Sequence, residues 1–188
     1  MSNKQSVTKA AQREPAEVVY AAELDKLRGM DHGPVPPGWQ MSPRAVEKFV
    51  MGDEKLGIER KFVADRAMVV RIIISLCTSR GCLLVGEPGT AKSWLSELLA
   101  AAISGSSTLT LQGGAVRSVG QLLYSWNAAV LHTEGPCLTA LVPSPLLRGL
   151  MEGQMVRFEE IARCPHALQD PLPSRHSDRG GVDTRPRG

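Results

Sequence analysis

Residues 86–93, with the sequence GEPGTAKS, combine glycines, a lysine and a hydroxyl group at the spacing of a phosphate-binding loop. Gly86, Lys92 and Ser93 match the pattern G-x-x-x-x-G-K-[ST], and Ala91 stands at its second glycine. Backbone N–H groups of such a loop point at phosphate oxygens, the lysine neutralises the β- and γ-phosphates, and the hydroxyl can bind Mg²⁺. The motif therefore predicts binding of a nucleoside triphosphate, with ATP favoured, together with Mg²⁺.

All eight loop residues are expected to contact the nucleotide. They are Gly86, Glu87, Pro88, Gly89, Thr90, Ala91, Lys92 and Ser93. Gly89 supplies flexibility, Pro88 stiffens the loop, and Ala91 adds only a methyl group. A chance glycine-proline turn is the competing interpretation, but the loop follows an expected strand and opens an expected helix, as a phosphate-binding loop does.

An acidic pair, Glu159 and Glu160, ends the segment QMVRFEEI at residues 154–161. Hydrolysis of a triphosphate needs one acid near the metal and a second acid to orient or deprotonate the attacking water. A strand of the same sheet would deliver both carboxylates to the ligand-binding edge. A solvated first helical turn is the alternative interpretation of the pair. Arg157 is expected to reach the sheet edge or to form a salt bridge with an acid.

Alternating strands and helices must position these groups. Strands are expected at residues 82–86, 107–114 and 154–161, and helices at 15–30, 42–52, 61–78, 92–104, 118–131 and 145–153. Residues 133–144 are expected to be irregular or β-like. This order indicates an α/β fold with a parallel sheet, in which ligands bind at the carboxyl ends of the strands.

Composition excludes several partner classes. The net charge of +3 is spread without a basic block, which argues against nucleic acid and an anionic membrane surface as partners. The longest apolar stretch, residues 67–77, contains Arg71 and is too short to span a bilayer, so we expect a cytoplasmic protein. The four cysteines show no CxxC pair or zinc-ligand spacing and are expected to be buried thiols.

Five segments together resemble the MoxR branch of the AAA+ ATPases over about residues 57–172. They are GEPGTAKS, LTLQGG, YSWNAAVLHTEGP, ALVPSPLLRGLMEG and VRFEEIARCPHALQD. The resemblance implies a P-loop NTPase three-layer fold with a parallel sheet, in which the loop at 86–93 is the Walker A motif. It also implies a chaperone-like remodelling activity on a client protein within a homo-oligomeric ring.

The same resemblance assigns individual roles. Glu159 takes the metal-binding position of the Walker B motif, usually an Asp, and would share Mg²⁺ with Ser93. Glu160 takes the water-activating position, so Glu160 and Lys92 are the expected catalytic residues. Residues 137–143 resemble an insert that usually faces the centre of the ring, and Arg163 could report on a neighbouring subunit.

The resemblance fades after Leu172, where Pro171 and Pro173 disfavour the expected helix. The domain prediction is a disordered 1–14, a helical leader with a Pro-rich linker at 15–56, a partial nucleotide-binding domain at 57–172 and a disordered, aberrant tail at 173–188. We expect a fold incomplete at its C-terminus through truncation or frame shift. Strands 82–85 and 155–158 would then lack the sensor strand between them.

Three functions remain open at this stage. The first is a MoxR-type ATPase. The second is a non-catalytic nucleotide-binding fragment that lacks sensor, arginine finger and lid. The third is a small-molecule phosphotransferase, which would need a lid with phosphate-clamping arginines, and no such segment is visible.

Overall fold

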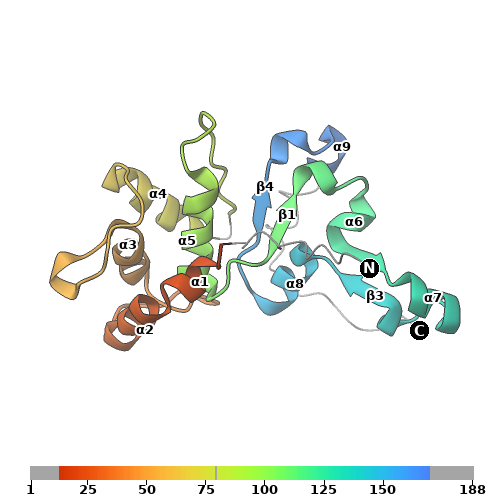
Figure 1. Ribbon diagram of the computed structural model, residues 1–188, viewed down its shortest axis with the longest axis horizontal. Coiled ribbons are helices and arrows are strands. Elements are labelled where there is room, and N and C mark those ends of the chain that lie inside the picture. The colour runs from red at the N-terminus through yellow and green to blue at the C-terminus, as the bar shows by residue number, and fades with distance from the viewer. Residues whose placement is uncertain (1–12, 79, 170–188) are drawn as a thin grey trace, which may run out of the picture.

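The computed structural model describes residues 13–78 and 80–169, and Figure 1 shows their elements in two groups side by side. The α-helices are α1 (Ala16–Val19), α2 (Ala21–Met30), α3 (Pro43–Met51), α4 (Arg66–Leu76), α5 (Lys92–Ser104), α6 (Val119–Leu123), α7 (Ala128–Glu134), α8 (Pro145–Glu152) and α9 (His166–Gln169). The strands are β1 (Thr110–Gln112), β2 (Tyr124–Trp126), β3 (Leu141–Pro143) and β4 (Arg157–Glu159). Single 3-10 turns are η1 (Glu54–Leu56), η2 (Gly113–Ala115), η3 (Leu138–Ala140) and η4 (Ile161–Arg163).

Helices α1 to α5 form the first group around one apolar core. Phe49 on α3 and Leu98 on α5 are fully buried in it, together with Leu24 on α2 and Val69 on α4. Burying a side chain of this size contributes about 1.5–3 kcal/mol relative to leaving it in water. Helix α5, which begins with Lys92, is therefore held along its length by the N-terminal helices.

Polar contacts of the N-terminal segment add to this packing, one at the middle of α5 and one just after its end. The Glu97 carboxylate accepts a hydrogen bond from the Ala16 N–H at 3.1 Å and pairs with Arg13 at 2.7 Å. The Glu17 carboxylate accepts from the N–H and the hydroxyl of Ser107 at 2.9 and 2.7 Å. The first helix thus joins α5 to the chain that leads into β1.

The second group is built on two small sheets. Strands β1 and β4 pair in parallel, with Leu111 opposite Phe158 and Gln112 opposite Glu159. Strands β2 and β3 pair antiparallel. A smaller buried cluster lies against β1 and consists of Leu111, Val116, Leu122, Leu146, Cys164 and Leu168.

The expected strand at residues 82–86 does not form. Residues 82–85 have no regular structure, and Leu83 and Val85 are 66% and 85% exposed. A strand needs a neighbour to satisfy its backbone N–H and C=O groups, and in the described part of the chain no strand pairs with this segment. The prediction of a buried strand before the loop was wrong for this reason.

The expected helix at 118–131 is also wrong in part. Strand β2 interrupts it between α6 and α7 because Ser125 pairs with Val142 of β3, across a long sequence separation. The β-like character expected at 133–144 is confirmed by η3 and β3. Tyr20 breaks the first expected helix in two, and the helix expected from residue 61 begins only at Arg66, where Asp65 caps it.

Other expectations are confirmed. Helix α3 begins with Ser42 as N-cap and Pro43 at its first position and ends at Gly52. Helix α5 ends at Gly105, which has φ 74°. The parallel pairing of β1 and β4 fits the predicted α/β class.

Cysteine burial was predicted incorrectly. Cys164 is buried, but Cys77 and Cys82 are exposed and Cys137 is half-buried. Cys82 is exposed because it belongs to the segment that forms no strand.

Among the described helices, none combines the length and apolar composition that crossing a bilayer requires. Two predictions lie outside the described residues. One is the disorder expected at 1–14, of which only Arg13 and Glu14 are described, and the other is the tail expected at 173–188. The predicted incompleteness of the C-terminus falls there as well.

Candidate functional site

The loop at residues 86–93 turns into α5 through a left-handed residue. Ala91 has φ 55° and ψ 30°, and its carbonyl accepts the first helical hydrogen bond from Leu95 at 2.9 Å. This conformation costs a residue with a Cβ about 1–2 kcal/mol, whereas glycine adopts it freely. The geometry explains why the general motif has glycine here and shows that Ala91 is tolerated under strain.

Lys92 folds back over the loop. Its ammonium donates hydrogen bonds to the carbonyl oxygens of Gly86, at 2.8 Å, and Glu87, and to the Thr90 hydroxyl, at 3.0 Å. The Thr90 hydroxyl in turn donates to the Glu87 carbonyl at 2.8 Å. The loop therefore encloses the lysine ammonium with oxygen atoms, and the charge is held at the loop centre.

Ser93 and Glu159 meet although 66 residues separate them in the sequence. The Ser93 hydroxyl, in the first turn of α5, donates to Oε2 of Glu159 at the end of β4 at 2.6 Å. These are the two residues predicted to share Mg²⁺. A hydroxyl and a carboxylate are hard oxygen ligands of the kind that Mg²⁺ prefers, and they are joined by substrate phosphates in most such sites. The donor set therefore fits Mg²⁺.

Arg157 holds this pair in place. Its guanidinium pairs with Glu159 Oε1 at 2.8 Å and donates to the Ser96 hydroxyl at 3.1 Å and the Ser107 carbonyl at 3.1 Å. The Arg157 and Glu159 side chains are only 11% and 16% exposed. The expected salt bridge of Arg157 is confirmed, and it fastens β4 to α5.

The charge state of Glu159 follows from these contacts. Burial alone would raise its pKa, but hydrogen bonds from Ser93 and Arg157, the Arg157 charge and the Ser96 hydroxyl outweigh burial and lower the pKa below its ordinary value. Glu159 is thus an anion at neutral pH, as a metal ligand must be. In the described part of the chain, no group of three or more His, Cys, Asp or Glu side chains is placed so that it could hold a metal ion.

Glu160, the predicted water-activating residue, points elsewhere. Its backbone is left-handed, with φ 53°, and its side chain is 49% exposed and pairs with Arg163 at 3.3 Å. In the described structure no hydrogen bond or ion pair joins its side chain to a loop residue. The structure therefore brings together Lys92, Ser93 and Glu159 on neighbouring elements, but it does not bring the Glu160 carboxylate to them.

Gly113, which follows β1, supports the left-handed turn at Glu160. A Cβ at Gly113 would lie 2.3 Å from the Glu160 carbonyl oxygen. Only glycine lets the two chain segments approach so closely. The turn after β4 thus depends on a residue in the neighbouring strand's exit loop.

Ser96 and Gly113 were not predicted as site residues, and Arg157 was predicted only to form a salt bridge. A signal existed for two of them. Ser96 lies one helical turn after Ser93, and Arg157 lies two residues before Glu159 in a strand, so each shares a face with a predicted site residue. The close approach at Gly113 depends on two distant segments and has no local signal.

Two comparisons with known proteins found matches to the chain. The family model described as "AAA domain (dynein-related subfamily)" matches residues 81–179, slightly more than half of the chain. Over 168 residues the chain is 54% identical to "Uncharacterized protein YehL" of Escherichia coli (strain K12). That alignment covers 89% of this chain and 46% of the relative, so the chain spans about half of the relative's length. No solved structure matches the chain.

Proposed function

Because the chain belongs to the AAA domain family of the dynein-related subfamily, we propose that it binds ATP with Mg²⁺ at residues 86–93 and hydrolyses it. The observation that carries this proposal is the 2.6 Å contact between Ser93 and Glu159. It places a motif hydroxyl and an acidic side chain from a different strand at one point, next to the loop that holds Lys92. A P-loop NTPase fold requires this convergence.

Lys92 has the first role in binding. Its ammonium is held by oxygen acceptors of the loop, and triphosphate binding would exchange these acceptors for the β- and γ-phosphate oxygens. The N–H groups at the start of α5 add a positive dipole on the same side. Ser93 and Glu159 would hold Mg²⁺, which neutralises charge on the transferred phosphoryl group.

Glu160 is the proposed general base. Its carboxylate would accept a proton from the attacking water, and for this it must leave Arg163 and turn toward the loop. Because that pair is largely exposed, separating it costs only about 0–1 kcal/mol. A modest rearrangement would thus complete the catalytic set of Lys92 and Glu160.

The wider activity is proposed from the MoxR resemblance. The nucleotide cycle would drive remodelling of a client protein by a homo-oligomeric ring in the cytoplasm, where ATP is available. Residues 137–143, which resemble the ring-facing insert, contain η3 and β3, and β3 pairs antiparallel with β2; this supports the assignment. Arg163 would contact a neighbouring subunit once released from Glu160. The domain division at residue 57 is part of the same proposal.

A second candidate is nucleotide binding without turnover. The observation that favours it is the ion pair of Glu160 with Arg163, which turns the proposed base away from Lys92. Misplacing a reacting group by about 1 Å can cost on the order of 100-fold in rate. The same chain would then bind ATP and fail to hydrolyse it.

Two measurements on the purified chain separate these functions. Binding of a fluorescent ATP analogue should be lost in Lys92→Ala and kept in the control Lys55→Ala, which replaces an exposed lysine on η1. Phosphate release should occur in the wild type and fall at least about 100-fold in Glu160→Gln if Glu160 is the base. Binding with no phosphate release in any variant supports the second candidate. Unchanged binding in Lys92→Ala contradicts both.

A further inference from the structure

A cationic groove runs along α3, outside the segment that the family model covers. It has a volume of about 550 Å³ and is partly open to solvent. Its lining residues are Arg44, Glu47, Lys48, Met51, Gly52, Asp53, Arg60 and Arg66. The lining holds four cationic and two carboxylate side chains, an excess of two positive charges, although the whole chain carries only +3.

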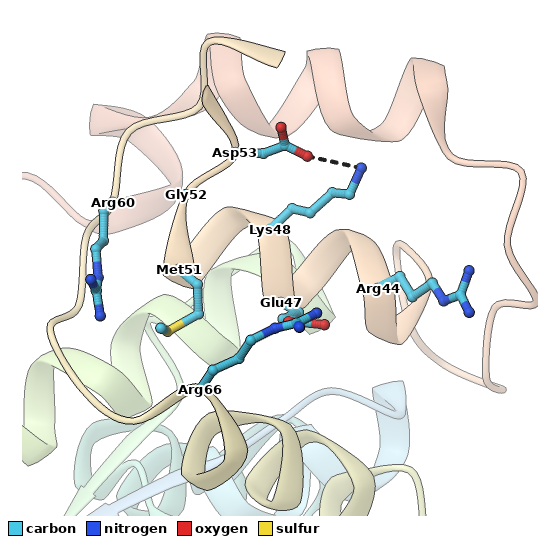
Figure 2. A pocket seen from close by; sticks show the side chains of 8 residues that line it. All are labelled: Arg44, Glu47, Lys48, Met51, Gly52, Asp53, Arg60 and Arg66. Atoms are coloured by element: carbon cyan, nitrogen blue, oxygen red, sulfur yellow. Dashed lines mark hydrogen bonds and ion pairs between the residues drawn. The ribbon is translucent and has the colours of Figure 1, made fainter. Parts of the chain in front are cut away.

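Two of the cations are neutralised within the groove. Lys48 pairs with Asp53 at 3.0 Å, and Arg66 pairs with Glu47. Figure 2 shows Lys48 joined to Asp53 by a dashed line, and Glu47 beside Arg66. The excess charge therefore belongs to the remaining two arginines.

Arg44 and Arg60 have no carboxylate partner in the described structure, and they stand at opposite ends of the groove (Figure 2). Arg44 is exposed in the first turn of α3, where the helix dipole disfavours a cation, and this turn contains no acidic residue. Arg60 donates only to backbone carbonyls, of Phe62 at 3.1 Å and Ala64 at 3.0 Å, so its charge stays uncompensated. Both positions favour an external anion.

The backbone fixes this arrangement. Gly52 has φ +81°, and a Cβ there would lie 2.8 Å from the Arg60 N atom. The N–H groups of Lys61 and Phe62 both donate to the Val50 carbonyl, at 3.1 and 3.2 Å. The segment that carries Arg60 is therefore held against the end of α3, and the groove is a built feature of the fold.

We infer that this groove binds an acidic, extended peptide segment of a partner protein, with carboxylates at Arg44 and Arg60 and its chain along Met51. An open trough with separated charges suits an extended chain, whereas small-molecule sites enclose most of the ligand surface. Charge complementarity of this kind steers association and selects the partner. The inference is independent of the nucleotide site, because no loop residue lines the groove.

The test uses fluorescence polarisation of labelled hexaglutamate with the full chain. The wild type should bind it, with affinity falling as salt rises, and should not bind hexaglutamine. Arg44→Gln and Arg60→Gln should each weaken binding about two- to fivefold and together about tenfold. Arg60→Lys, which keeps the charge, should keep most of the affinity. The matched control Arg71→Gln, an exposed arginine on α4 away from the groove, should bind as the wild type does.

Three results would overturn the inference. They are no binding of hexaglutamate by the wild type, an equal loss in Arg71→Gln, and binding of an oligouridylate with the same dependence on Arg44 and Arg60. Binding of the fluorescent ATP analogue, measured on the same samples, should be unchanged in every variant. This measurement distinguishes a wrong inference about the groove from a wrong proposal about the nucleotide site.

Discussion

The two sides of the nucleotide site differ in how they are held. Lys92 and Ser93 begin α5, whose buried face packs into the five-helix core, whereas Glu159 ends a three-residue strand with one paired neighbour. The segment before the loop is not in a sheet at all. The phosphate-binding side is therefore rigid through packing, and the acidic side depends on the polar contacts of Arg157. The site is therefore assembled by the contacts of Arg157 with Glu159, Ser96 and the Ser93 carbonyl, which we call the Arg157 clamp, and not by a continuous sheet.

Substitutions in the two apolar cores should change the free energy of unfolding most. Leu98→Ala on α5 should lower the free energy of unfolding by about 3–5 kcal/mol, because Leu98 is fully buried among five helices. Leu111→Ala on β1, in the smaller cluster, should cost about 2 kcal/mol. Urea unfolding followed by circular dichroism measures both. Equal losses of unfolding free energy in the two variants would contradict the claim that α5 is held more firmly than the β1–β4 side.

The second effect tests the clamp. Arg157→Met removes the partner of a largely buried carboxylate and should cost about 1–3 kcal/mol, less than a fully buried pair would. Arg148→Met is the matched control, because its pair with Glu152 is exposed, and it should change stability by less than about 0.5 kcal/mol. Urea unfolding of both variants measures the difference. If the two variants lost the same amount, Arg157 would not hold β4 to α5.

A third test concerns the turn at the end of β4. Gly113→Ala would place a methyl group against the Glu160 carbonyl and should cost about 1–2 kcal/mol through the shift it forces. Gly114→Ala, whose added methyl would lie 3.9 Å from the nearest side-chain atom, should be close to neutral. Thermal unfolding of both variants provides the measurement. A neutral Gly113→Ala would show that the turn moves freely.

The smallest expected effect is the part of the pH dependence of the free energy of unfolding that comes from Glu159, the acidic partner of Arg157. The pKa of Glu159 is lower in the folded chain than its ordinary value of 4.5. Its contribution to stability is therefore fully present above that value and is lost as the pH falls through the lowered folded pKa. The free energy of unfolding of the wild type should fall more steeply in this acidic window than that of Glu159→Gln. Parallel curves for the two proteins would contradict the assignment.

Local signals account for what the sequence predicted correctly. The cap Ser42, the first-turn Pro43 and the terminal Gly52 define α3 without any distant partner. The loop motif likewise placed Lys92 and Ser93 at the start of α5. These features follow from the conformational preferences of a few adjacent residues.

Long-range pairing explains what was missed. Residues 82–86 have the composition of a buried strand, yet no described strand supplies a ladder for them. The helix predicted at 118–131 is interrupted because β2 pairs with the distant β3. The groove along α3 forms because the backbone at Arg60 packs closely against Gly52. The pairing of Ser93 with Glu159 was predictable only because the loop motif implies an acidic partner from another strand.

The most direct test of the central claim is the magnesium dependence of nucleotide binding. Affinity for a fluorescent ATP analogue should rise when Mg²⁺ is added to the wild type, because the proposed ligands Ser93 and Glu159 would hold the ion beside the phosphates. That gain should disappear in Ser93→Ala and in Glu159→Gln, whereas Mg²⁺-free binding and the control Ser106→Ala should be unchanged. A full magnesium gain in Glu159→Gln would contradict the claim that β4 delivers the metal ligand to the loop.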